Sequence, residues 1–371
     1  MLLVLKIFLP ASFYFHRKWV TFVFQVKISL EIMEKDRVTI KDIASELGIS
    51  PSTVSKALKG HSDISSETKK AVRELVEKWN YKPDPIALSL KGGHGRTIGV
   101  IIPETVHHFF STVISGIEDL AYESGYNVMF CQSNEIYERE VKSVETLLTC
   151  RVDGILVSMS KYTSCFDHFR KIIKTGIPLV FFDRICEEIE TDRVIVNDEQ
   201  GAFDAVDYLI KTGCRNIIHL SAPQNLLIGR NRKDGYMRAL RQNNLDMVEE
   251  NIVKCDTAEE ARKVLPELLK RERKPDAIFA VNDLTAATAM KMVKLNGYTI
   301  PDDISIVGFS CDLISDLTDP SLTTVHQHGD IIGKEAVSLL IDHLENRKGT
   351  ACETKVIRTE LVVKGSTKML R

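Results

Sequence analysis

Short apolar runs alternate with amphipathic stretches of helical length from Thr97 onward, and this alternation constrains the fold more than any other feature. Runs that are apolar throughout are typical of parallel strands covered by helices on both faces. The pattern extends over about 270 residues, which exceeds one sheet of ordinary size, so it predicts two similar α/β lobes with parallel sheets flanked by helices. We expect the chain to leave the first lobe near residues 193–197, before a new helical pattern at Glu199. The runs are TIGVIIP, YNVMFCQ, GILVS, IPLVFFD, NIIHLSA, AIFAVN and ISIVGFS.

Polar and aromatic side chains follow these runs, at the strand ends where open parallel sheets bind their ligands. Carboxylate, guanidinium, amide and aromatic groups that meet in one cleft would suit a polyhydroxylated or anionic small molecule. For any single residue, a helix cap or an ion pair between lobes is the commoner role. The prediction of a ligand-binding cleft therefore depends on the location that all these residues share, at the ends of the predicted strands. The candidate ligand-binding residues are Phe109, Phe110, Ser160, Asp183, Arg184, Arg232, Asn282 and Asp283.

Residues 39–60, TIKDIASELGISPSTVSKALKG, contain two short helical patterns that meet at a glycine. Thr39 followed by Asp42 is a capping signal for the first helix, which Gly48 ends. Ser50 can cap the second helix. The apolar faces consist of Ile40, Ile43, Ala44 and Leu47 in the first pattern and Val54, Ala57 and Leu58 in the second. This arrangement is typical of a helix-turn-helix DNA-binding motif.

The second helix has small hydroxyl groups and a cationic group on its outer face. In a helix-turn-helix motif the start of this helix enters the major groove, where such groups contact base edges or phosphates. An ordinary helical hairpin with a polar outer face has the same spacing, so the motif by itself leaves both interpretations open. The candidate DNA-binding residues of this helix are Ser50, Pro51, Ser52, Thr53, Ser55 and Lys56.

A third helix is predicted from Ser65, in the segment SSETKKAVRELVEKWN, and it supports DNA binding. Its apolar residues Val72, Leu75, Val76 and Trp79 can close a three-helix core. Residues 38–82 therefore form the predicted DNA-binding headpiece. Residues 83–96 are predicted as a hinge helix and linker, because residues 86–90 are long enough for one or two helical turns and Gly92-Gly93 marks a flexible exit. Residues 97–371 form the two-lobed part.

The charge distribution agrees with this division. Residues 34–96 carry 12 Lys and Arg against 9 Asp and Glu, and residues 1–33 carry 4 against 1. Since the whole chain has a formal net charge of −2, residues 97–371 have a charge of −8. A mildly basic headpiece on an acidic body fits a small module that contacts phosphates.

Residues 1–33 are apolar and aromatic, but charged residues and Pro10 interrupt them, so they contain no uninterrupted span of about 18 apolar residues. A signal peptide would need a better cleavage site than Ala11-Ser12. We interpret Met33 as the start of translation and residues 1–33 as a non-native upstream extension; a membrane-tethered regulator is the alternative.

The eight cysteines include no C-x-x-C pair, as expected for reduced thiols in a cytoplasmic protein.

The segment from Thr39 to Pro103 resembles the amino-terminal region of the LacI/GalR (lactose-repressor) family of bacterial transcription regulators. The resemblance continues through RVDGILVSMS, IPLVFFDR, GRNRKDGYMRAL, PDAIFAVNDLTA, IPDDISIVGFS and DPSLTTV. It implies a repressor that binds a pseudo-palindromic double-stranded DNA operator as a homodimer. It also implies control by a small-molecule effector in the cleft, by default a sugar or sugar acid, and three passages of the chain between the lobes, with a strand at 354–364 finishing the second lobe.

The resemblance also assigns roles to individual residues. Arg232 matches an effector-binding arginine, and Asp283 matches an acid that accepts hydrogen bonds from effector hydroxyls. The pair Arg184 and Arg232 favours an anionic effector. Leu90 matches the hinge leucine that enters the minor groove and kinks the duplex, with Lys91 beside it. Phe110, Ser160, Asp183 and Arg184 match cleft positions that vary with the effector.

Other functions have weaker support. The glycines at 92–95 precede a strand instead of following one, which argues against a dinucleotide site. His326 and His328 have no neighbouring acid or cysteine at metal-site spacing, so we expect no metal. We expect no cofactor and no membrane contact, and we find no catalytic motif for the alternative of a sugar-metabolising enzyme. The main alternative is a two-lobed solute-binding receptor without a DNA-regulatory role.

Overall fold

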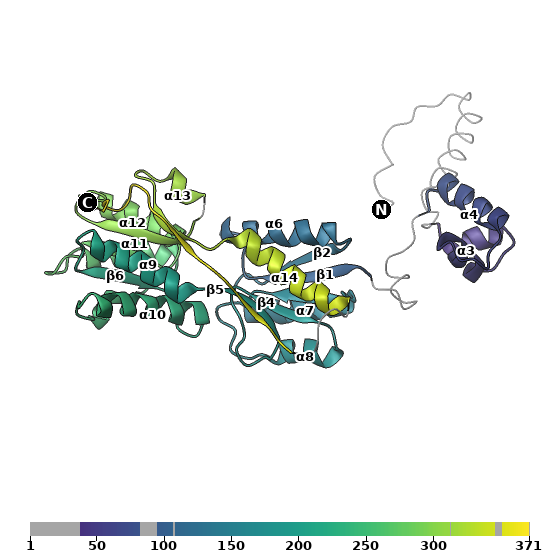
Figure 1. The fold of residues 1–371 in the computed structure, drawn as a ribbon, viewed down its shortest axis with the longest axis horizontal. Helices are drawn as coiled ribbons and strands as arrows, with labels where there is room; N and C mark the ends of the chain where they lie inside the picture. Colours follow the sequence, from purple (N-terminus) through teal and green to yellow (C-terminus); the bar gives the residue numbers. More distant parts are fainter. Residues whose placement is uncertain (1–37, 82–94, 107, 312, 346–350, 371) are drawn as a thin grey trace, which may run out of the picture. The chain divides into compact units, whose positions relative to one another are not determined.

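The computed structural model describes residues 38–81, 95–106, 108–311, 313–345 and 351–370. The chain divides into two compact units, residues 1–92 and residues 93–371 (Figure 1). The proposed extension at 1–33 and most of the hinge, including the candidate DNA-binding residues Leu90 and Lys91, lie outside the described residues.

The first unit contains the predicted three-helix headpiece, with α2 (Ile40–Glu46), α3 (Pro51–Leu58) and α4 (Ser66–Lys78). Each helix begins at a capping side chain: Thr39 forms a capping box with Asp42, and Ser50 and Ser65 accept hydrogen bonds from Thr53 N and Thr68 N. Between α2 and α3 the chain turns at Gly48, whose φ of +62° favours glycine. The buried core is Ile43, Ala44, Val54, Ala57, Val72 and Leu75.

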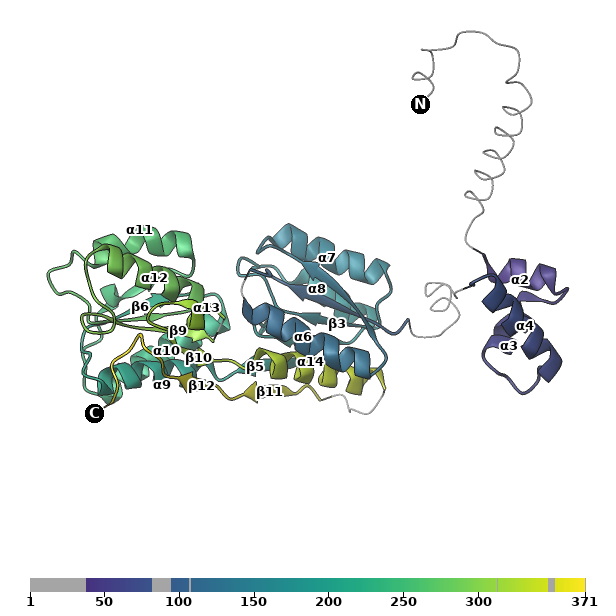
Figure 2. The same cartoon turned by 90° about the horizontal axis from the view of Figure 1, so that it is seen from above.

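The first lobe of the second unit is a six-stranded sheet in the order β11-β5-β4-β3-β1-β2, with every pair parallel. Helices α6 and α14 cover one face, and α7 and α8 cover the other (Figure 2). The strands are β1 (Thr97–Ile102), β2 (Asn127–Gln132), β3 (Gly154–Val157), β4 (Leu179–Phe182), β5 (Asp192–Val196) and β11 (Thr354–Ile357), and the helices are α6 (His108–Glu123), α7 (Tyr137–Thr149), α8 (Asp167–Thr175) and α14 (Gly329–Leu344).

The second lobe repeats this plan, with the strand order β12-β10-β9-β8-β6-β7. Helices α9 and α10 pack on one face and α11 and α12 on the other. The strands are β6 (Ile217–Ser221), β7 (Ile252–Lys254), β8 (Ala277–Ala280), β9 (Ser305–Ser310), β10 (Thr323–His326) and β12 (Glu360–Val362), and the helices are α9 (Asp198–Lys211), α10 (Leu227–Gln242), η1 (Glu249–Asn251), α11 (Ala258–Leu268), α12 (Asp283–Leu295) and α13 (Ile314–Leu317). The predicted two-lobed α/β architecture is confirmed.

The chain passes between the lobes three times: after β5, after β10 and after β11. The expectation that a strand at 354–364 finishes the second lobe is wrong in part. Its first half, β11, pairs in parallel with β5 of the first sheet, and only β12 joins the second sheet, antiparallel to β10. Both halves are edge strands with partly exposed side chains, so the sequence pattern contains no sign of the change of sheet.

Helices α6 and α14 approach each other closely because each presents a glycine at the contact. A Cβ atom at Gly333 of α14 would lie 2.2 Å from the carbonyl oxygen of Val113, and one at Gly116 of α6 would lie 2.1 Å from that of Asp330. The contact joins an early helix to a segment that returns from the second lobe. It therefore fixes the carboxy-terminal part of the chain to the first sheet.

The run YNVMFCQ forms an edge strand, β2, which has exposed and half-buried positions instead of the continuous burial that its apolar character suggested. Among the described residues, no helix combines the length and apolar character needed to cross a membrane.

Candidate DNA-reading helix and interlobe pocket

Helix α3 presents most of the predicted DNA-binding side chains at its exposed or half-buried surface. Pro51 occupies the first turn and Ser52 is exposed next to it, whereas Thr53 and Ser55 are half-buried. Ser50 already has a structural role, because its Oγ accepts a hydrogen bond of 3.1 Å from Thr53 N. Its hydroxyl also lies 2.7 Å from Ser52 Oγ, so the start of the helix carries a cluster of hydroxyl groups.

Lys56 forms an ion pair within the headpiece. Its Nζ lies 2.5 Å from Oδ2 of Asp63, and both side chains are about half exposed, at 51%. The hydrogen bond from Lys56 holds the pKa of Asp63 below its ordinary value. The cation is therefore accessible to solvent, and Asp63 already occupies part of its hydrogen-bonding capacity.

A pocket in the second unit is lined by residues of both lobes, with about 530 Å³ of empty space that includes part open to solvent. Six of the eight predicted ligand-binding residues line it. They are Phe109, Phe110, Asp183, Arg184, Arg232 and Asn282.

Ser160 and Asp283 do not line this pocket. Ser160 is fully buried, and its Oγ lies 2.6 Å from Ser133 Oγ. Asp283 is also fully buried, and its Oδ1 accepts a hydrogen bond of 2.5 Å from Thr324 Oγ1. Strand β9 covers this carboxylate, because a Cβ atom at Gly308 would lie 2.1 Å from the same oxygen. Strand-end position alone could not distinguish these buried side chains from exposed ones.

The sequence analysis missed several lining residues, including Asp256, Ser310 and Gln327. Each lies at or just after the end of a strand, so the rule that found the other residues could have found these. Asp256 was missed because β7 has only three residues, with half-buried or exposed side chains. Gln327 follows β10, a strand that does not belong to the apolar runs whose ends gave the candidate residues.

Asp183 follows β4 with a φ of +57°, in the left-handed region that non-glycine residues rarely adopt. Its carboxylate is buried, and Ser158 Oγ donates a hydrogen bond of 3.3 Å to it. Burial raises the pKa of Asp183 from 3.8 to about 6, although the neighbouring Arg184 opposes the shift. Such strained and desolvated residues concentrate at functional sites.

The two arginines of the pocket already have anionic partners. Arg184 Nη1 lies 2.5 Å from Glu135 Oε1, and its guanidinium lies 5.9 Å from the ring centre of Phe110. Arg232 Nε lies 2.7 Å from Asp198 Oδ1, and its Nη1 donates a hydrogen bond of 2.6 Å to the carbonyl oxygen of Val281. The two guanidinium groups of the pocket are therefore held in fixed orientations, and the paired carboxylates offset part of their positive charge.

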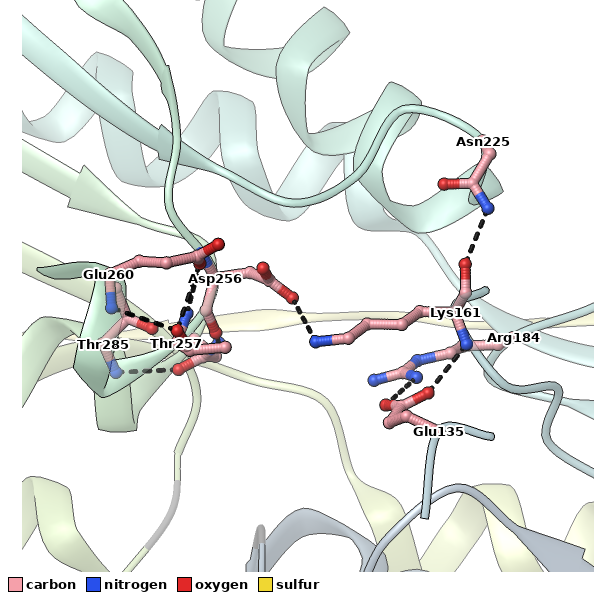
Figure 3. Close-up of polar contacts among 9 residues, drawn as sticks. Glu135, Lys161, Arg184, Asn225, Asp256, Thr257, Glu260 and Thr285 are labelled. Carbon is pink, nitrogen blue, oxygen red and sulfur yellow. Dashed lines mark hydrogen bonds and ion pairs between the residues drawn. The ribbon is translucent and has the colours of Figure 1, made fainter. Parts of the chain in front are cut away.

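A set of polar contacts joins the two lobes beside the pocket (Figure 3). Lys161, from the loop after β3, reaches Asp256 of the second lobe, with 3.2 Å between Nζ and Oδ2. Asn225 of the second lobe donates from Nδ2 to the carbonyl oxygen of Lys161 at 2.7 Å. We call these two contacts the interlobe bridge. Since Asp256 also lines the pocket, one end of the bridge lies at the pocket surface.

The two histidines considered as metal ligands lie together where the chain passes from β10 to α14. The ring centres of His326 and His328 are 4.1 Å apart. In the described part of the chain, no group of three His, Cys, Asp or Glu side chains is placed to hold a metal ion.

Residues 39–84 match the bacterial regulatory proteins of the lacI family, and residues 206–367 match the periplasmic binding protein-like domain. The HTH-type transcriptional repressor PurR of Vibrio campbellii is 34% identical over 340 residues, which cover 90% of this chain and 99% of that protein. The chain belongs to the lacI family. As a lacI-family member, it is a helix-turn-helix DNA-binding transcriptional regulator with an effector-binding domain.

Solved structures have the same fold. A Lac repressor dimer bound to operator and the anti-inducer ONPF superimposes with a TM-score of 0.77 and 24% identity, covering 90% of this chain and 99% of that one. A periplasmic binding protein/LacI transcriptional regulator from Alkaliphilus metalliredigens, complexed with D-xylulofuranose, superimposes with a TM-score of 0.64 and 28% identity, covering 74% of this chain and 100% of that one. The lacI-family assignment favours the regulator over the solute-receptor alternative. The relatives are repressors, not enzymes.

Proposed function

We propose that this protein represses transcription from the cytoplasm as a homodimer that binds a pseudo-palindromic operator, and that a carbohydrate effector in the interlobe pocket controls operator binding. The observation that carries the proposal is the combination of a helix-turn-helix headpiece with a pocket lined by residues from two lobes. The Lac repressor dimer on its operator and the regulator bound to D-xylulofuranose support the dimer and the carbohydrate, respectively. No catalytic step is part of the proposal.

The proposed DNA contacts are made by the start of α3. Ser52, Ser55 and Lys56 would contact bases and phosphates, while Ser50, Pro51 and Thr53 would hold the helix start in place and add backbone or hydroxyl contacts. From the family resemblance we add Leu90 and Lys91 of the hinge, at the minor groove.

The proposed control follows from the position of the pocket. A ligand that contacts both lobes stabilises the relative orientation of the lobes in which those contacts are best. It shifts the equilibrium between DNA-binding and non-binding forms only by its difference in affinity for the two forms. The effector contacts would come from Phe109, Phe110, Asp183, Arg184, Arg232 and Asn282. Ser160 and Asp283, which are buried and do not line the pocket, would support these residues from beneath.

The test is selection of bound sequences from random duplex DNA by the full chain, with and without sugars and sugar acids. We expect recovery of a pseudo-palindrome, and a change in recovery with at least one sugar or sugar acid. The Ser52→Ala variant should recover less DNA while its melting temperature stays unchanged. Recovery of an unpaired half-site would contradict the homodimer, and no enrichment under any condition would contradict the DNA-binding role.

A further inference from the structure

Each cation at the pocket is paired with a carboxylate. Arg232 pairs with Asp198 at 2.7 Å, and Arg184 pairs with Glu135 at 2.5 Å. The third cation, Lys161, pairs with Asp256 at 3.2 Å. The side chains of the two arginine pairs are at most 13% exposed, so water does little to screen these interactions. Each cation's charge is thus offset before any ligand binds, so an anionic ligand is attracted less strongly than it would be by an unpaired cation.

Asp183 is a carboxylate beyond the three that pair with these cations. Asp183 lines the pocket, and the contact of Asp183 with Arg184 Nε is long, at 3.9 Å. The guanidinium of Arg184 is already bonded to Glu135 at its other side. Since Arg184, Arg232 and Lys161 each have a nearer carboxylate, Asp183 keeps only its long contact with Arg184, and its negative charge is the least compensated of those that line the pocket.

The remaining hydrogen-bonding groups suit hydroxyls. Asp183 can accept bonds beyond the one from Ser158. Gln327 lines the pocket, is 2% exposed, and its Nε2 has no hydrogen-bond partner among the described residues. A hydroxyl group can donate to the carboxylate and accept from the amide. The Phe109 and Phe110 rings, whose centres are 5.2 Å apart, offer an apolar surface to the face of a sugar ring.

We infer that this pocket selects an uncharged, hydroxylated ligand and rejects sugar acids and sugar phosphates, because its cations are neutralised internally and Asp183 adds a negative charge. This reverses the expectation from the sequence, where Arg184 and Arg232 favoured an anion. Asp198 and Glu135 are then specificity-determining residues that act through the arginines, and Asp183 acts directly. The inference rests on the proposed effector control.

The experiment uses small molecules from a bacterial extract, separated into an acidic fraction retained by an anion exchanger, a basic fraction retained by a cation exchanger, and a neutral fraction retained by neither. Each fraction is titrated against the full chain bound to its selected operator. We expect the neutral fraction still to change operator affinity after at least tenfold greater dilution than the acidic fraction tolerates. Activity confined to the acidic or the basic fraction would overturn the inference.

Two variants test the cause. Asp198→Asn releases Arg232 and Asp183→Asn removes the least compensated negative charge, so each should raise the potency of the acidic fraction at least tenfold relative to the neutral one. Glu187→Gln is the control, because its ion pair with Arg230 is exposed and neither residue lines the pocket. If Asp198→Asn does not fold, Asp183→Asn still tests the inference. An acidic fraction that stays inactive with every folded variant would overturn the assigned cause.

Failure of the proposed function gives a different result. If the chain binds its operator and no fraction alters that binding, effector control is wrong and the inference falls with it. If the acidic fraction alone acts, effector control stands and only the charge selection is wrong.

Discussion

The carboxylate of Asp183 occupies a position where its charge is costly to the folded protein. It is buried, follows a strand in the left-handed conformation, and has a pKa raised to about 6. The folded state binds the proton of the Asp183 carboxyl group more tightly than the unfolded state does. Protonation of Asp183 therefore contributes its full stabilisation of the folded state below about pH 4, and this contribution is lost as pH rises through about 6. A functional group held at the expense of stability is the simplest account.

Asp183→Asn should therefore raise the free energy of unfolding at pH 7.5, by at most about 3 kcal/mol for a shift of about two pKa units. We expect the difference from the parent protein to shrink as pH falls toward 4, measured by urea unfolding between pH 4.5 and 8. Asp302→Asn, at an exposed position, is the control. A variant whose stability follows pH in parallel with the parent protein would contradict the account.

The ion pair of Lys56 with Asp63 predicts opposite effects of two substitutions on operator binding. Lys56→Met should weaken binding and lower the salt dependence by about one released counterion, because it removes the phosphate contact proposed for Lys56. Asp63→Asn should tighten binding, since it releases Lys56 and removes a negative charge near the DNA. Fluorescence anisotropy at several salt concentrations measures both. Lys263→Met, whose ion pair with Glu259 lies in α11, should change neither quantity.

At the scale of helices and strands, the contact between α6 and α14 depends on the absence of a side chain. Gly333→Ala would place its Cβ 2.2 Å from a backbone oxygen of α6, which cannot move without shifting the helix. We expect a loss of about 2–3 kcal/mol in the free energy of unfolding, as is typical of overpacking. Chemical denaturation measures this loss. Lys334→Ala, at the next and exposed position of α14, should cost less than about 0.5 kcal/mol.

The elements themselves were largely predictable, because capping residues and apolar periodicity are local signals. Thr39, Ser50 and Ser65 begin the predicted helices. The pairing of side chains at the pocket was not predictable in the same way. Asp198 and Arg232 are 34 residues apart, and Glu135 and Arg184 are 49 apart. Only the folded sheets bring these charges together, which is why the arginines suggested an anionic ligand from the sequence alone.

At the scale of the whole two-lobed unit, the interlobe bridge links the lobes through partly buried charges. Lys161 and Asp256 are only 10% and 15% exposed. Lys161→Met or Asp256→Asn alone should lower the free energy of unfolding by about 2 kcal/mol, because the remaining charge loses its partner. The double variant should cost clearly less than the sum of the two, which a double-mutant cycle measures. The exposed pair Lys263 and Glu259, treated identically, should show a coupling of about 0.5 kcal/mol or less.

The three passages between the lobes have a consequence for synthesis on the ribosome. Strand β11 and helix α14 belong to the first sheet, although the whole of the second lobe up to β10 precedes them in the chain. A nascent chain cannot complete its first lobe until Ile357 has been made, and the apolar face of α6 that packs on α14 has no cover until Leu344 has been made. A premature stop codon after β10 would thus expose apolar surface in both lobes at once, and would mark the truncated product for proteolysis instead of leaving one intact lobe.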